Sequence, residues 1–129
     1  GMRVQVLLVS MNRSVRDALA DWFRTVLPDC CVRHASGARD AVAQGQEDPP
    51  DLVVIQESGS DGSCFETIRA IAASAFEAPM IVLTDKDYAG HRDRLMEAGA
   101  SACILPWKIN PDLVDAIEQL NVAKVTAWI

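Results

Sequence analysis

Short apolar runs alternate with amphipathic segments along the whole chain. The runs predict strands, and they cover Val4–Val9, Cys31–Ala35, Asp51–Gln56, Met80–Thr84 and Ala102–Leu105. They are nearly continuous rather than alternating, which is typical of a parallel sheet with both faces covered. Five strand–helix pairs in 129 residues leave roughly 25 residues for each pair, which suits a βα unit. The pattern therefore predicts one α/β domain with a single open sheet.

The segment after the first run has the clearest helical pattern. Its apolar residues recur at i, i+3 and i+4 spacing, and they are Val15, Ala18, Leu19, Trp22, Phe23 and Val26. Asn12 or Ser14 is expected to cap this helix, because both side chains can accept hydrogen bonds from the first free amides. Pro28 and Asp29 are expected to end it.

The remaining segments predict further helices from their caps as much as from their periodicity. We expect a small helix around Ala38–Gln44 capped by Ser36, a helix opened by a Ser63/Glu66 capping box, a helix over Gly90–Ala98 closed by Gly99, and a last helix beginning at Asn110-Pro111.

The net charge of the chain argues against two classes of binding partner. The chain has 12 Lys and Arg against 18 Asp and Glu, a net charge of −6 at pH 7. Such a chain is repelled by phosphate backbones and anionic lipid surfaces, so we expect no direct nucleic-acid binding and no membrane binding. No apolar run approaches the ~20 residues that span a bilayer. We therefore expect a cytoplasmic protein.

The four cysteines are Cys30, Cys31, Cys64 and Cys103. None forms a C-x-x-C pair, and no histidine or carboxylate lies beside them at the spacing of a metal site. We expect reduced, mostly structural thiols, no metal site and no cofactor.

Ligands of open α/β sheets bind beyond the carboxyl ends of the strands. The candidate segments are Ser10-Met11-Asn12, Gln56-Glu57, Thr84-Asp85 and Pro106-Trp107-Lys108. Neither His34 nor His91 has a cysteine or serine partner in a recognisable catalytic arrangement.

Three motifs in order carry a resemblance to a known family. They are P-D-L-V-V-I-x at Pro50–Gln56, I-V-L-T at Ile81–Thr84 and E-A-G-A-S at Glu97–Ser101, the last leading into a strand and the Pro106 loop. The chain resembles, over essentially its whole length, the CheY-like receiver domain of two-component response regulators. The resemblance implies a doubly wound, flavodoxin-like sheet of five parallel strands in the order 2-1-3-4-5. It places a receiver-like domain at residues 2–122, with 123–129 extending the last helix or starting a linker.

Receiver domains take up a phosphoryl group on an aspartate that ends the third strand, and an acidic pair after the first strand binds magnesium. The carboxylate is the nucleophile and the cation neutralises phosphoryl oxygens. In this chain the acidic pair falls on Ser10 and Met11, and the acceptor falls on Gln56. An amide is not a nucleophile at neutral pH. The resemblance therefore implies a degenerate pseudo-receiver that is not an enzyme.

The other family positions are only partly kept. Thr84 matches the residue that ends the fourth strand, whereas the lysine before the proline falls on Leu105, with Lys108 close by. The aromatic residue that many receivers carry on the fifth strand falls on Cys103. Trp107 is expected either to plug the vacated phosphate pocket or to pack against the last helix.

Receivers commonly use their fourth helix, fifth strand and fifth helix as a dimer or effector face. Apolar residues beyond the expected core fall there, namely Leu95, Met96, Cys103, Val114 and Trp128. We therefore expect an interaction module that docks a protein partner or effector domain, or that forms a homodimer.

Two alternatives remain open. A receiver could still accept phosphate through an unconventional site such as Asp61, whereas strand alternation points Glu57 to the other face of the sheet end. A small flavodoxin-like protein could instead bind a nucleotide or flavin at the helix start after Ser10, although this loop contains no glycine.

Overall fold

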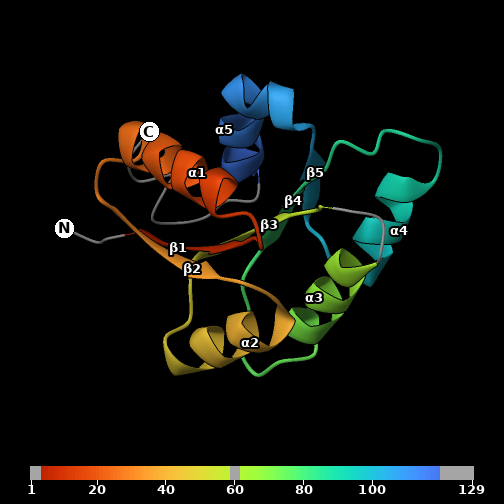
Figure 1. The fold of residues 1–129 in the computed structure, drawn as a ribbon, viewed down its shortest axis with the longest axis horizontal. Helices are drawn as coiled ribbons and strands as arrows, with labels where there is room; N and C mark the ends of the chain where they lie inside the picture. The colour runs from red at the N-terminus through yellow and green to blue at the C-terminus, as the bar shows by residue number, and fades with distance from the viewer. Residues whose placement is uncertain (1–3, 59–61, 120–129) are drawn as a thin grey trace.

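The computed structural model describes residues 4–58 and 62–119. Strands and helices alternate along the chain (Figure 1), in the order β1 (Val4–Val9), α1 (Arg13–Val26), β2 (Cys30–Ala35), α2 (Ala38–Glu47), β3 (Leu52–Gln56), α3 (Ser63–Ala72), β4 (Met80–Leu83), α4 (His91–Ala98), β5 (Ala102–Ile104), a short 3-10 helix η1 (Pro106–Lys108) and α5 (Ile109–Gln119). The predicted strands are all present, with ends that differ by at most one residue.

The strands form one five-stranded sheet in the order β2-β1-β3-β4-β5, and every neighbouring pair is parallel. This confirms the doubly wound α/β fold. Val6 lies opposite Leu52 on β3, and Val53 lies opposite Met80 on β4. The carboxyl ends of β1, β3 and β4 therefore meet at one edge of the sheet, where the first and third strands are neighbours.

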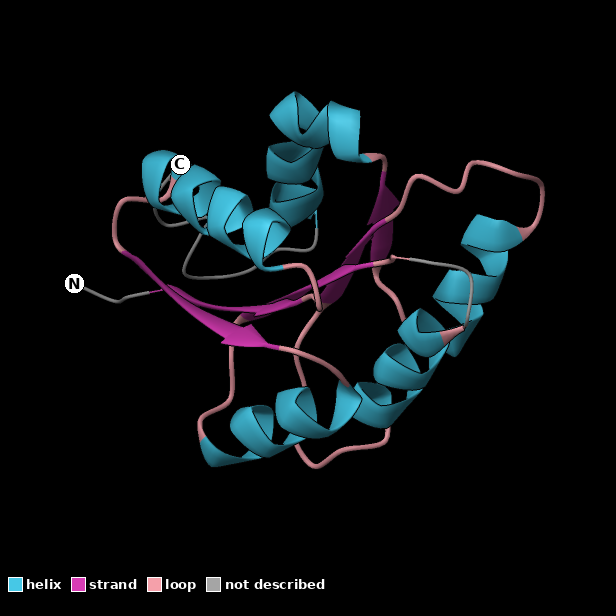
Figure 2. Ribbon diagram, viewed as in Figure 1, coloured by secondary structure: helices cyan, strands magenta, loops and turns pink. Residues whose placement is uncertain are grey.

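Helices cover both faces of the sheet (Figure 2), with α1 and α5 on one side and α2, α3 and α4 on the other. Alternate residues of each strand enter two separate cores. The first core joins Val6 and Leu8 to Phe23, and the second joins Leu7 and Val9 to other buried side chains. Both sides of the central strands are therefore apolar, which explains their continuous hydrophobic runs.

The structure confirms one predicted N-cap residue and corrects two others. Of the two predicted caps, Asn12 rather than Ser14 caps α1, because the Asn12 Oδ1 accepts a hydrogen bond from the Val15 backbone amide at 3.1 Å. The predicted caps Ser36 and Ser63 are wrong, since Gly37 precedes α2 and Gly62 precedes α3. Gly62 has a φ of 80°, a left-handed conformation that glycine adopts without strain and serine does not.

The start of the last helix is close to the prediction. Asn110, the second residue of α5, has extended rather than helical backbone angles, as an N-cap residue does, so the helix is kinked there. Its side-chain oxygen accepts a hydrogen bond from the Trp22 indole at 3.2 Å, which ties α5 to α1. The predicted extension at 123–129 lies outside the described residues. Within the described ranges, no helix is long and apolar enough to cross a membrane.

Candidate functional site

Ser10 and Gln56 lie side by side where β1 and β3 end. The Ser10 hydroxyl donates a hydrogen bond to the Gln56 side-chain oxygen and accepts one from the Asn12 amide at 3.0 Å. Ser10 is buried and Gln56 is half-buried. Gln56, the residue at the acceptor position, therefore has a neutral hydroxyl as its hydrogen-bond donor rather than a cation.

A cavity of about 100 Å³ opens beside this pair, and Met11 is among the residues that line it. Glu66 is the one carboxylate among its described lining residues, and this side chain is exposed. A magnesium ion on a receiver-like site needs carboxylate oxygens close together. Among the described residues there is no group of three or more histidine, cysteine or acidic side chains that could hold a metal ion.

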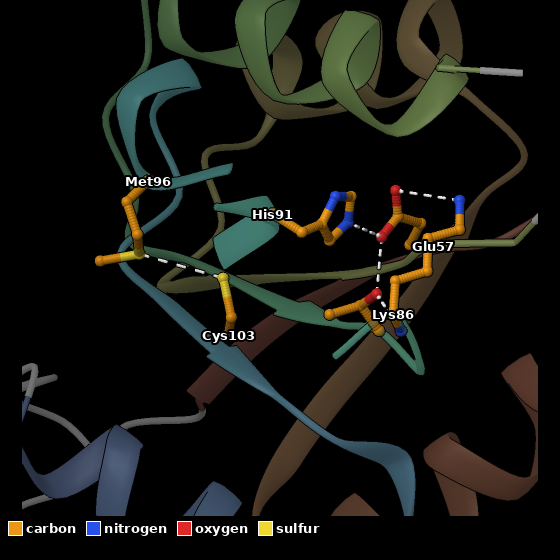
Figure 3. A network of polar contacts seen from close by, with 6 residues as sticks. Glu57, Lys86, His91, Met96 and Cys103 are labelled. Atoms are coloured by element: carbon orange, nitrogen blue, oxygen red, sulfur yellow. Dashed lines mark hydrogen bonds and ion pairs between the residues drawn. The ribbon is translucent and has the colours of Figure 1, made fainter. Parts of the chain in front are cut away.

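The buried side chain of Glu57 lies in a cluster of polar residues (Figure 3). Its Oε1 accepts hydrogen bonds from the Thr84 hydroxyl at 2.6 Å and from the His91 Nε2 at 2.7 Å. Its Oε2 lies 3.5 Å from the Lys86 ammonium. We call Glu57, Thr84, Lys86 and His91 the Glu57 cluster. It joins the end of β3, the loop after β4 and the first turn of α4.

The surroundings of Glu57 favour its ionised form. Burial is the strongest single influence and on its own raises the pKa, but hydrogen bonds from Thr84 and His91 and the charges of His91 and Lys86 outweigh it. The pKa of Glu57 is therefore lowered from its usual value of 4.5. A buried carboxylate with this many donors is a stable anion at neutral pH.

His91 is almost wholly enclosed. An ionised carboxylate only accepts hydrogen bonds, so the proton on Nε2 is the one shared with Glu57. Nδ1 is buried and has no hydrogen-bond partner in the described part of the chain. The rings of Tyr88 and Phe65 flank the imidazole at centroid distances of 4.8 and 5.8 Å.

The predicted pocket residues do not share one cavity. Thr84 and Lys108 line a separate cavity of about 170 Å³ together with Lys86, Arg92 and Cys103, apart from the cavity of Ser10, Met11 and Gln56.

Trp107 lines neither strand-end cavity. Its side chain is 66% exposed and borders a groove on α1 that also contains Val15, Leu19 and Trp22. The hypothesis that Trp107 plugs the vacated pocket is therefore wrong, because η1 turns the indole toward α1.

The predicted interaction face also needs a correction. Leu95 is completely buried in the second core, so it cannot contact a partner. Met96, Cys103 and Val114 are half-buried, and the Cys103 and Met96 sulfur atoms lie 3.9 Å apart (Figure 3). Trp128 lies outside the described residues.

The four cysteines are free thiols. Cys64 is buried on α3, and burial, with a smaller contribution from the negative charge of Glu57, raises its pKa to about 12. Burial also raises the pKa of Cys103 and of Cys30. These thiols are therefore protonated and weakly nucleophilic at neutral pH.

Sequence reasoning missed the pairing of Glu57 with His91. Strand alternation correctly separated Glu57 from Gln56, but it did not supply a partner for the carboxylate. The sequence did offer one signal: Glu57 follows a buried strand on a face of the sheet that helices cover, and a buried carboxylate there needs hydrogen-bond donors. The distance of 34 positions between the two residues hid the donor.

No protein-family model and no curated protein matches the sequence. Solved structures do match. A LuxR-family two-component response regulator from Aurantimonas sp. SI85-9A1 is 24% identical with a TM-score of 0.81, covering 95% of this chain and 87% of its own. The signal receiver domain of a DNA-binding response regulator from Colwellia psychrerythraea 34H is 21% identical with a TM-score of 0.75, covering 91% and 97%.

The chemotaxis response regulator CheY4 of Vibrio cholerae is 19% identical with a TM-score of 0.71, covering 81% of this chain and 88% of its own. At these identities the likeness concerns the backbone arrangement. The chain therefore has the fold of response-regulator receiver domains.

Proposed function

We propose that this chain is a degenerate receiver domain of two-component or phosphorelay signalling, acting in the cytoplasm as a phosphorylation-independent protein-interaction module. The observation that carries the proposal is the Gln56 side chain at the acceptor position, hydrogen-bonded to the Ser10 hydroxyl. A receiver fold with no nucleophile at this position cannot accept a phosphoryl group, but its outer surfaces remain available for binding other proteins.

The chemical argument concerns both the nucleophile and the cation. An acyl phosphate forms when a carboxylate oxygen attacks the phosphorus atom, and an amide cannot replace it at neutral pH. The magnesium that would neutralise the phosphoryl oxygens needs carboxylate ligands, whereas Ser10 and Met11 stand at the positions of the acidic pair. The module is accordingly not an enzyme.

The state of such a domain must be set by something other than phosphate. A binding partner shifts a conformational equilibrium only through a difference in its affinity for the two states. We propose that this partner is an effector domain or a second copy of the chain, docked on α4, β5 and α5. The half-buried Met96, Cys103 and Val114 supply apolar contact area there.

The direct test is the intact mass of the purified protein after incubation with magnesium and acetyl phosphate. The proposal expects no gain of a phosphoryl group. A gain that disappears in Asp61→Asn would overturn it and identify a receiver with an unconventional acceptor. Glu66→Gln is the matched variant for the carboxylate that lines the Gln56 cavity.

A further inference from the structure

The Glu57 cluster has the donor set of an anion-binding site. A hydroxyl, an ammonium and an imidazole N–H converge from the loop after β4 and from α4 on one carboxylate. Charge-assisted hydrogen bonds of this kind are what a protein offers to a bound carboxylate or phosphate. Here the anion belongs to the chain itself.

The donors are oriented toward Glu57 by their own neighbours. The Thr84 hydroxyl oxygen accepts a hydrogen bond from the Lys86 amide at 3.1 Å, so its proton is free to be donated to Glu57. His91 is held between the Tyr88 and Phe65 rings, with Nε2 directed at the carboxylate. The site is thus preorganised around an anion.

Glu57 interacts electrostatically with two thiols in this interior region. The thiols of Cys64 on α3 and Cys103 on β5 are protonated, because burial raises the pKa of both. Neither thiol therefore adds a charge to the surroundings of the Glu57 cluster. Within the cluster, the carboxylate of Glu57 is the anion that pairs with the Lys86 ammonium and with the His91 N–H.

We propose that Glu57 is a tethered anion, a built-in ligand that occupies a carboxylate-binding site made by Thr84, Lys86 and His91. It holds the loop after β4 and the first turn of α4 in place without any external ligand. This inference deepens the proposed function and rests on it for any role in signalling. In that role, the Glu57 cluster would hold the domain in one conformational state without phosphate. The ligand class that fits the emptied site is a small carboxylate.

Acetate is the matched probe, because Glu57→Ala removes a CH₂–COO⁻ unit and acetate supplies the same carboxylate on one carbon. Amide hydrogen exchange of the full chain is the readout. The Lys86 amide bonds to Thr84 Oγ1 and the Arg94 amide bonds to the Gly90 carbonyl, so both report on the segment that the cluster holds. The Arg16 amide in the first turn of α1 is an internal reference.

In Glu57→Ala we expect protection of the Lys86 and Arg94 amides to fall about tenfold or more, because a buried ion pair has lost one partner. The Arg16 amide should be unaffected. Acetate should restore part of the lost protection, and sodium chloride at equal ionic strength should not. Glu97→Ala, an exposed acid on the same helix, should resemble the unaltered chain.

Unchanged protection in Glu57→Ala, or equal effects of acetate and chloride, would overturn the proposal. If Glu57→Ala does not fold, Thr84→Val removes one donor at nearly constant volume. It should still lower protection of the Lys86 and Arg94 amides, and a normal exchange pattern would contradict the inference. Phosphoryl uptake by the unaltered chain would refute the proposed function alone, since the acetate rescue does not depend on it.

Discussion

The carboxylate of Glu57 and the imidazole of His91 lie 2.7 Å apart in the interior, although 34 positions separate them in the chain. The contact fastens the first turn of α4 to the end of β3. Thr84 joins it at 2.6 Å, so the loop between β4 and α4 is fixed at both ends. The acceptor position holds an amide, whereas this neighbouring cluster holds a buried carboxylate whose pKa is lowered.

The first prediction concerns acid stability. The pKa of Glu57 is lowered from 4.5 in the folded chain, so its ionised form stabilises the fold above that value. This contribution is lost as the pH falls through the lower, folded-state pKa. The free energy of unfolding should therefore drop more steeply with acid in the unaltered chain than in Glu57→Gln. Urea titrations between about pH 6 and about pH 3 measure both. Parallel curves would contradict the assignment.

The second prediction concerns thiol reactivity. Cys64 is buried and its pKa is raised to about 12, so almost no thiolate exists at neutral pH. Alkylation of Cys64 by iodoacetamide should follow the rate at which the fold opens, and it should become fast in denaturant. Mass mapping of the modified peptides distinguishes the four cysteines. Rapid native labelling of Cys64 would show that α3 is more open than described.

The third prediction concerns Gly45 on α2. A β-carbon at this position would collide with the ring of Phe76, whereas one at Gly37 meets nothing within 4 Å. Overpacking of this kind costs about 1–3 kcal/mol. Gly45→Ala should lower the free energy of unfolding by that amount, and Gly37→Ala should not. Adding Phe76→Leu should recover part of the loss; no recovery would place the cause elsewhere.

The fourth prediction concerns self-association. If a second copy docks on α4, β5 and α5, Met96→Lys places a charge in the contact and should weaken it. Met11→Lys is the matched control, because Met11 is 76% exposed at the end of β1, away from this face. Sedimentation equilibrium over a range of concentrations measures the effect. A monomer at all concentrations would leave an effector domain as the docked partner, and equal effects of both variants would contradict this face.

The elements that rest on local pattern were predicted well. The run Val4–Val9 forms β1 with the same bounds, and Asn12 caps α1, because periodicity and capping depend on near neighbours. The strand order came from the motif resemblance and is confirmed. Local pattern failed where the backbone uses a left-handed glycine, as at Gly62 before α3.

The candidate site was less predictable than the fold. The sequence identified Gln56 and Ser10 as residues of the strand ends, but not that they bond to each other. The direction of the Trp107 side chain depends on the turn at η1, which no periodicity reports. The partnership of Glu57 and His91 depends on tertiary packing of α4 against β3, and one sequence holds no local signal for it.

The most direct measurement is fluorine NMR of the purified protein with magnesium and beryllofluoride, which imitates a phosphoryl group on a carboxylate. The account predicts only the resonances of free beryllofluoride and fluoride, because Gln56 offers no carboxylate oxygen to beryllium. A receiver domain with an intact aspartate shows that the mixture is competent. A bound resonance that requires magnesium would contradict the account, and the variant that removes it would name the acceptor.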